Sequence, residues 1–173
     1  MKVAITGHTQ GIGRAIADLY PDHIGFSRSN GYDISVETSR EQIVHESLDS
    51  DIFINNAVID HCQTKMFMEI FDVWKHNPNK TIVNINSRAK YLAGTDNEYW
   101  NAKVKLFEQV AKNLFGRKCR IININPGYVM TDSSKESIEK FNMPYMSTQT
   151  CADYVRWAIN QPMEIWEVSF WEI

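Results

Sequence analysis

Short apolar runs alternate along the chain with longer segments in which apolar residues recur at helical spacing. A short apolar run bounded by turn residues is typical of a buried strand, whereas apolar residues three or four positions apart indicate a helix buried on one face. Strands are predicted at residues 3–6, 24–27, 51–55, 81–85, 120–124 and 165–171, and helices at 11–19, 39–48, 63–76, 98–115 and 148–160.

This alternation predicts one α/β domain over residues 1–173, because no linker, repeat or low-complexity tract divides the chain. The strands are apolar enough to be covered on both faces, which is typical of a parallel sheet between two layers of helices. Ligands of such sheets bind at the carboxyl ends of the strands.

Composition excludes several classes of partner. Lys and Arg number 18 against 21 Asp and Glu, for a net charge of −3, so neither a nucleic acid nor an acidic membrane surface is an expected partner. The basic tract 117–120 is the local exception and is expected to be a solvated loop. The three cysteines form no CxxC pair, no apolar stretch is long enough to span a membrane, and Met1 leads directly into the first strand. These features predict a cytoplasmic protein without a structural metal site.

A glycine-rich turn, Thr6-Gly7-His8-Thr9-Gln10-Gly11-Ile12-Gly13, joins the first predicted strand to the first helix. Glycines permit a tight turn and a close backbone approach, and the N-terminus of the helix offers unpaired N–H groups to an anion. The turn therefore predicts a binding site for the pyrophosphate of a dinucleotide.

The spacing TGxxxGxG resembles that of the short-chain dehydrogenase/reductase family, and four further segments resemble the motifs of that family in the same order. They are Asn55-Asn56-Ala57 for NNAG with Val58 replacing the glycine, the strand 82–86 that ends before Ser87, Tyr99-Trp100-Asn101-Ala102-Lys103 for YxxxK, and 125–131 for the PG…T segment.

The resemblance implies a Rossmann-like doubly wound sheet and an oxidoreductase that moves hydride between a nicotinamide cofactor and a small carbonyl or alcohol. Its catalytic residues would be Ser87, Tyr99 and Lys103. Its cofactor-binding residues would be Gly7, Thr9, Gln10, Gly11, Ile12, Gly13, Ser27, Arg28, Asp33, Ile34, Asn55, Asn56, Ala57, Lys103, Pro126, Gly127, Val129 and Thr131.

The chemistry of the three catalytic residues is consistent with that role. Tyr99 and Lys103 are four residues apart on a predicted helix, so their side chains share a face. A nearby ammonium is expected to lower the tyrosine pKa, which favours proton exchange with a carbonyl or alcohol. Ser87 follows a strand end and is expected to hold the substrate oxygen.

The second predicted strand ends at Ser27-Arg28 rather than at an acidic residue. A guanidinium binds phosphate through two parallel hydrogen bonds, so NADP(H) is the expected cofactor and NAD(H) the alternative.

Several features depart from the family. Only five residues separate Ser27 from Asp33, which predicts that the second helix and the third strand are reduced. The Asn that relatives carry near the start of the helix before Ser87 is missing; His61 or Gln63 could replace it, although an exposed histidine at the helix start is the simpler interpretation. These departures keep a second hypothesis open, a dinucleotide-binding sensor with little turnover. A sugar-nucleotide epimerase would need a larger second domain than this chain supplies.

The substrate side and the oligomeric state are less defined. Relatives form homodimers or homotetramers through a helix pair, a contact that Phe67, Phe71 and Trp74 could make, but burial inside the monomer explains them equally well. Core packing also explains the expected substrate-pocket residues, which are Ala89, Tyr91, Tyr128, Met130 and residues 143–146.

Overall fold

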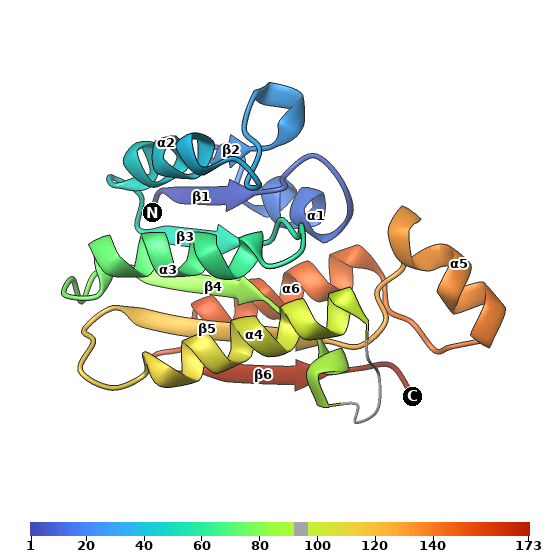
Figure 1. Cartoon of the computed structure of the whole chain (residues 1–173). Coiled ribbons are helices and arrows are strands. Elements are labelled where there is room, and N and C mark those ends of the chain that lie inside the picture. Colours follow the sequence, from blue (N-terminus) through green and yellow to red (C-terminus); the bar gives the residue numbers. More distant parts are fainter. Residues whose placement is uncertain (92–96) are drawn as a thin grey trace.

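The computed structural model describes residues 1–91 and 97–173 and forms a six-stranded sheet between two layers of helices (Figure 1). All neighbouring strands run parallel, in the order β2-β1-β3-β4-β5-β6. The strands are β1 (Val3–Thr6), β2 (Ile24–Phe26), β3 (Ile52–Asn55), β4 (Thr81–Ile85), β5 (Arg120–Pro126) and β6 (Glu167–Phe170). The α-helices are α1 (Gly11–Leu19), α2 (Glu37–Ser47), α3 (Cys62–Trp74), α4 (Glu98–Lys112), α5 (Asp132–Phe141) and α6 (Thr148–Ile159); η1 (Arg28–Asn30) and η2 (Arg88–Tyr91) are 3₁₀ turns.

Alternate side chains of each strand enter two separate cores, because successive residues of a strand point to opposite faces of the sheet. Ile5 and Ile54 pack with α1 and α6 on one face, whereas Ala4 and Phe53 pack with α2, α3 and α4 on the other. The predicted parallel sheet with helices on both faces is confirmed (Figure 1).

Helix α3 turns its aromatic side chains inward. Phe67, Phe71 and Trp74 are all buried in the core that α3 shares with α4 and the sheet. Of the two interpretations of these residues, burial inside the monomer is confirmed, and they are not available for a contact between subunits.

The sheet edge beside β2 lacks the third strand that a complete doubly wound sheet would have. Residues 31–36 form no strand, and the second helix is reduced to the single turn η1. Arg40 fastens this segment from α2: its Nη1 donates to the carbonyl oxygen of Ile34 at 3.0 Å, and its Nε lies 2.9 Å from Oε1 of Glu69 on α3. An ion pair between a buried guanidinium and a partly exposed carboxylate therefore holds the chain where the strand is missing.

Helix α5 was not predicted from the sequence. It lies beyond the carboxyl ends of the strands and away from the sheet (Figure 1), and Ile138 is its one buried residue. A helix with so little apolar surface shows no apolar stripe, so periodicity does not reveal it. Its boundaries have local causes, since Thr131 and Ser134 form a capping box at its start and Asn142 adopts the left-handed conformation at its end.

No helix in the described ranges is long and apolar enough to cross a membrane. In the same ranges, no group of three or more His, Cys, Asp or Glu side chains is placed to hold a metal ion.

Candidate active site

The turn between β1 and α1 can be built only with glycine at its key positions. Gly7 and Gly11 have φ angles of +70° and +55°, and a Cβ at Gly13 would lie 2.1 Å from the carbonyl oxygen of Gly7. Gln10 caps α1 without a side-chain hydrogen bond, so its side chain does not occupy the first amides of the helix. The turn therefore has the geometry of a phosphate-binding cradle.

The end of β3 closes against this turn. The Nδ2 of Asn56 donates to the carbonyl oxygens of Thr6 at 3.1 Å and Gly7 at 3.2 Å, and the hydroxyl of Thr6 accepts from the backbone amides of Asn56 and Ala57. Asn55 points the other way into the protein, where its buried Nδ2 donates to Gln63 and Asn84. Asn55 thus fixes α3 and β4, while Asn56 fixes the cradle.

The adenosine side of the predicted site lies at the end of β2. The Arg28 side chain is exposed. The hydroxyl of Ser27 is hydrogen-bonded to the Ser29 hydroxyl and to Oδ1 of Asn30. The Asp33 carboxylate accepts two hydrogen bonds from Ser35, which lower the pKa of this exposed group. Ile34, also predicted to contact the cofactor, directs its side chain into the core.

The segment after β5 approaches the cradle from the other side. A Cβ at Gly11 would lie 3.4 Å from Cγ2 of Thr131, so two segments far apart in sequence meet there. A cavity of about 330 Å³ opens at this junction. Pro126 and Val129 are buried, and the amide of Gly127 donates to Phe170 on β6. The cavity is lined by Gly11, Arg14, Ala15, Asp18, Met130, Thr131, Asp132, Thr148 and Gln149.

Ser87, Tyr99 and Lys103 come together at the carboxyl end of β4. Tyr99 and Lys103 share one face of α4, with Nζ of the lysine 5.5 Å from the centroid of the tyrosine ring. Ser87 follows β4, and its side chain hydrogen-bonds that of Tyr99. The structure therefore brings together the three residues that the resemblance implies, with Tyr99 and Lys103 on one face of α4 as their spacing predicts.

Gln63 completes the cluster from α3. The Lys103 Nζ donates to Oε1 of Gln63 at 2.9 Å and to the carbonyl oxygen of Ile85 at 2.8 Å. The Nε2 of Gln63 donates in turn to the carbonyls of Asn55 and Ile85. His61 is exposed at the start of α3. Of the two residues weighed for the position of the missing Asn, Gln63 is the one that contacts the lysine.

The electrostatics of this cluster correct one expectation. Burial lowers the pKa of Lys103 to about 7. Burial also raises the pKa of Tyr99, and the opposing hydrogen bond from Ser87 does not outweigh it. We expected an ammonium to lower the pKa of Tyr99. Instead, desolvation shifts the pKa of each polar group toward its neutral form, although half of the Tyr99 surface is exposed.

Of the residues expected to line the substrate pocket, Tyr91 and Tyr128 have exposed side chains. Met146 does not, since it is buried and its backbone pairs with Val129 and Met130.

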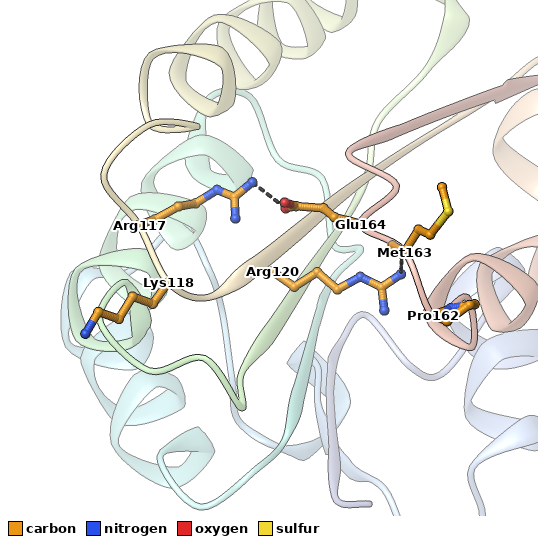
Figure 2. Close-up of a pocket in the computed structure, with 6 residues that line it drawn as sticks. All are labelled: Arg117, Lys118, Arg120, Pro162, Met163 and Glu164. Atoms are coloured by element: carbon orange, nitrogen blue, oxygen red, sulfur yellow. Dashed lines mark hydrogen bonds and ion pairs between the residues drawn. The ribbon is translucent and has the colours of Figure 1, made fainter.

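A second cavity, of about 220 Å³, lies beside the start of β5 (Figure 2). This is the amino end of the strand, whereas the cradle lies at the carboxyl ends of the strands. Figure 2 shows that Arg117 and Arg120 extend between two loops toward Glu164 and Met163, whereas Lys118 points away. Arg117 pairs with Glu164, and Arg120 donates to carbonyls at the end of α6. Cys119 is buried and the Arg117 side chain is 9% exposed, so the expectation of a solvated loop is wrong: the tract links α4 to β5 and packs against the end of α6.

Neither a family model nor a curated protein matches the sequence. Solved structures do match. A serine dehydrogenase complexed with NADP⁺ has a TM-score of 0.80 at 17% identity, covering 98% of this chain and 94% of that chain. A 3-alpha-hydroxysteroid dehydrogenase from Pseudomonas sp. B-0831, complexed with NADH, has a TM-score of 0.79 at 16% identity, covering 99% and 95%. A short-chain dehydrogenase/reductase from Vibrio parahaemolyticus has a TM-score of 0.75 at 18% identity, covering 99% of each chain. This chain therefore has the Rossmann-like fold of these dehydrogenases.

Proposed function

We propose that this chain is an NADP(H)-dependent oxidoreductase of the short-chain dehydrogenase/reductase family, acting on a small carbonyl or alcohol. One observation carries the proposal: the side chain of Tyr99 hydrogen-bonds that of Ser87, and its ring centroid lies 5.5 Å from the buried Lys103 amine, at the carboxyl ends of the strands where the glycine cradle also lies. A protein that only bound a dinucleotide would need the cradle but not this cluster of proton-transfer groups.

The residues present fit a nicotinamide dinucleotide. The cradle would take the pyrophosphate at the N-terminus of α1, since no side-chain hydrogen bond from Gln10 occupies the first amides of that helix. Ser27, Arg28 and Asp33 would contact the adenosine end, and Ala57 the region between the two halves. Lys103 would use its remaining N–H for a ribose hydroxyl. The nicotinamide end would lie against the segment formed by Pro126, Gly127, Val129 and Thr131.

The bound cofactor would supply or accept hydride at the substrate carbon. Tyr99 is protonated at neutral pH, as any tyrosine with an unshifted or raised pKa is, and donates that proton to the developing alkoxide during reduction. Ser87 holds that oxygen by hydrogen bonding. Lys103, with a pKa of about 7, can replace the lost proton, and Gln63 holds the lysine in reach.

The preference for NADP(H) rests on Arg28. No carboxylate in the described part of the chain lies within ion-pair distance of its guanidinium, and the side chain is exposed beside the Ser27 hydroxyl. A 2′-phosphate would be bound there through charge-assisted hydrogen bonds.

An Arg28→Ala variant tests this preference by calorimetry. Its affinity for NADPH should fall by about tenfold or more, while its affinity for NADH changes little. The Arg156→Ala variant, which removes an exposed arginine of α6, serves as the control. Equal losses for both cofactors would contradict the preference.

One observation favours the alternative, a dinucleotide-binding protein with little turnover. Gln63 and Ile85 already engage two of the hydrogens of Lys103, which restricts its movement toward a cofactor. Calorimetry with NADPH, followed by NADPH oxidation against a panel of aldehydes and ketones, separates the two functions. Binding with carbonyl-dependent oxidation supports the oxidoreductase; binding without oxidation of any carbonyl supports the alternative.

A cytoplasmic location and a homodimeric or homotetrameric assembly belong to the same proposal. Any subunit contact would have to use residues other than the buried aromatic side chains of α3. Light scattering coupled to size-exclusion chromatography measures the assembly.

A further inference from the structure

The turn η2, directly after Ser87, carries two cationic side chains with different surroundings. The charge of Lys90 is paired inside the protein, where its side chain is only 2% exposed. Its Nζ lies 3.2 Å from Oε2 of Glu167 on β6 and 3.8 Å from the centroid of the Phe107 ring. Burial lowers the pKa of Lys90, and the neighbouring carboxylate opposes that shift. Lys90 therefore has a structural role in fastening η2 to β6.

Arg88 is held differently, by an aromatic ring. Across residues 1–91 and 97–173, no carboxylate lies within ion-pair distance of its guanidinium. Instead, its Cζ lies 3.5 Å from the centroid of the Trp171 ring, a cation–π contact that supports one flat face of the guanidinium. Stacking on a face leaves the N–H groups at the edge of a guanidinium able to donate hydrogen bonds.

The support for Arg88 is itself anchored at the proposed active site. Trp171 follows β6 and packs on Gly127, because a Cβ at Gly127 would lie 2.8 Å from Cβ of Trp171. Gly127 belongs to the segment expected to contact the nicotinamide. The contact between Arg88 and Trp171 therefore connects η2, which follows Ser87, to Gly127, which follows β5.

The turn is also held rigidly. Besides the ion pair of Lys90, the Tyr91 hydroxyl donates to Glu167 and lies 3.3 Å from the Ser169 hydroxyl. These contacts fix η2 to the last strand before any ligand arrives, and a group positioned in advance loses less entropy on binding.

We propose that Arg88 binds a carboxylate of the substrate, so that the natural substrate is a small carbonyl or alcohol that also carries a carboxylate. This inference rests on the proposed function for the position of the reacting carbon at Ser87 and Tyr99. A carboxylate fits because it accepts two parallel hydrogen bonds from one guanidinium. Two cations that lie close to Ser87 are committed elsewhere: Lys90 to Glu167, and Lys103 to Gln63.

The experiment compares each of three carboxylates with its methyl ester: pyruvate, levulinate and 4-formylbenzoate. Binding is measured by titration calorimetry to the full chain, with and without NADP⁺, so that the result does not depend on turnover. The variants are Arg88→Gln, Arg88→Lys and Trp171→Leu. Lys118→Gln, which removes one positive charge at the opposite edge of the sheet, is the control.

The wild-type protein should bind at least one carboxylate about tenfold or more tightly than its ester, as expected for hydrogen bonds to a charged group. This preference should disappear in Arg88→Gln, fall partly in Arg88→Lys and Trp171→Leu, and persist in Lys118→Gln. The inference is overturned if no pair shows a preference, or if Arg88→Gln retains it. An Arg88-dependent preference in a protein that oxidises no NADPH would support the inference while refuting the proposed function.

Discussion

Gln63 is the residue on which the geometry of the candidate site depends most. Its side chain makes three hydrogen bonds inside the protein, one from Lys103 and two to the backbone of β3 and β4. Because all of its polar atoms are used, it ties α3 to both strands and positions the amine of Lys103.

Replacing Gln63 with Met, which has a similar volume, should lower the free energy of unfolding by roughly 2–4 kcal/mol, since buried polar groups lose their partners. Urea denaturation measures the change. Gln149→Met, on the exposed face of α6, should stay within about 0.5 kcal/mol of the wild type. An equally small effect of Gln63→Met would show that its hydrogen bonds do not stabilise the fold.

Individual residues were predictable where chain geometry alone decides their position. The spacing of Tyr99 and Lys103 places both on one face of any helix, and a residue that ends a parallel strand must lie at the ligand edge. The partner of Lys103 was not predictable, because choosing Gln63 over His61 requires the rotation of α3. The direction of the Tyr99 pKa shift was also not predicted, because the desolvation of its hydroxyl cannot be read from local spacing.

At the scale of elements, the contacts of Arg40 hold the segment beside β2 that does not form a strand. Arg40 reaches from α2 to Glu69 on α3 and to the backbone of Ile34, and its side chain is only 5% exposed. This contact connects two helices to a segment that has no strand partner.

An Arg40→Leu variant should lose about 2 kcal/mol of stability, because a carbonyl and a partly exposed carboxylate are left without their donor. Hydrogen exchange of residues 31–47 should increase more than that of β4 and β5. Arg156→Leu, which breaks an exposed pair with Asp153, should have almost no effect on stability. Uniform exchange across the protein would contradict this local role.

Most elements were predicted within a few residues because their apolar pattern is strong. Helix α4 was predicted to reach residue 115, but it ends at Lys112, and Phe115 is 93% exposed. Helix α5 escaped prediction since capping rather than packing defines it. Local hydrogen bonding therefore marks the limit of an apolar-pattern argument.

At the scale of the whole molecule, the buried amine of Lys103 links stability to pH. Its pKa falls from 10.5 to about 7 on folding, so above pH 7 the unfolded chain binds more protons than the folded one. Stability should therefore rise with pH from about 7 toward about 10, by at most about 1.4 kcal/mol per pH unit from this group.

Urea denaturation of the wild type and of Lys103→Met between about pH 7 and about pH 9 isolates this contribution. The difference in stability between the two proteins should change steadily with pH in favour of the wild type. Lys112→Met, at the exposed end of α4, should follow the wild type. A pH-independent difference between the wild type and Lys103→Met would mean that Lys103 keeps an ordinary pKa.

The central claim is that Tyr99 transfers the proton in a nicotinamide-dependent reaction. The most direct test is the rate of NADPH oxidation with a carbonyl that the wild type reduces, measured for Tyr99→Phe beside the affinity for NADPH. Tyr154→Phe, on α6, is the matched control. We predict that kcat falls by about 100-fold or more in Tyr99→Phe, with the affinity for NADPH largely retained and the control fully active. Near-normal turnover by Tyr99→Phe would contradict the account.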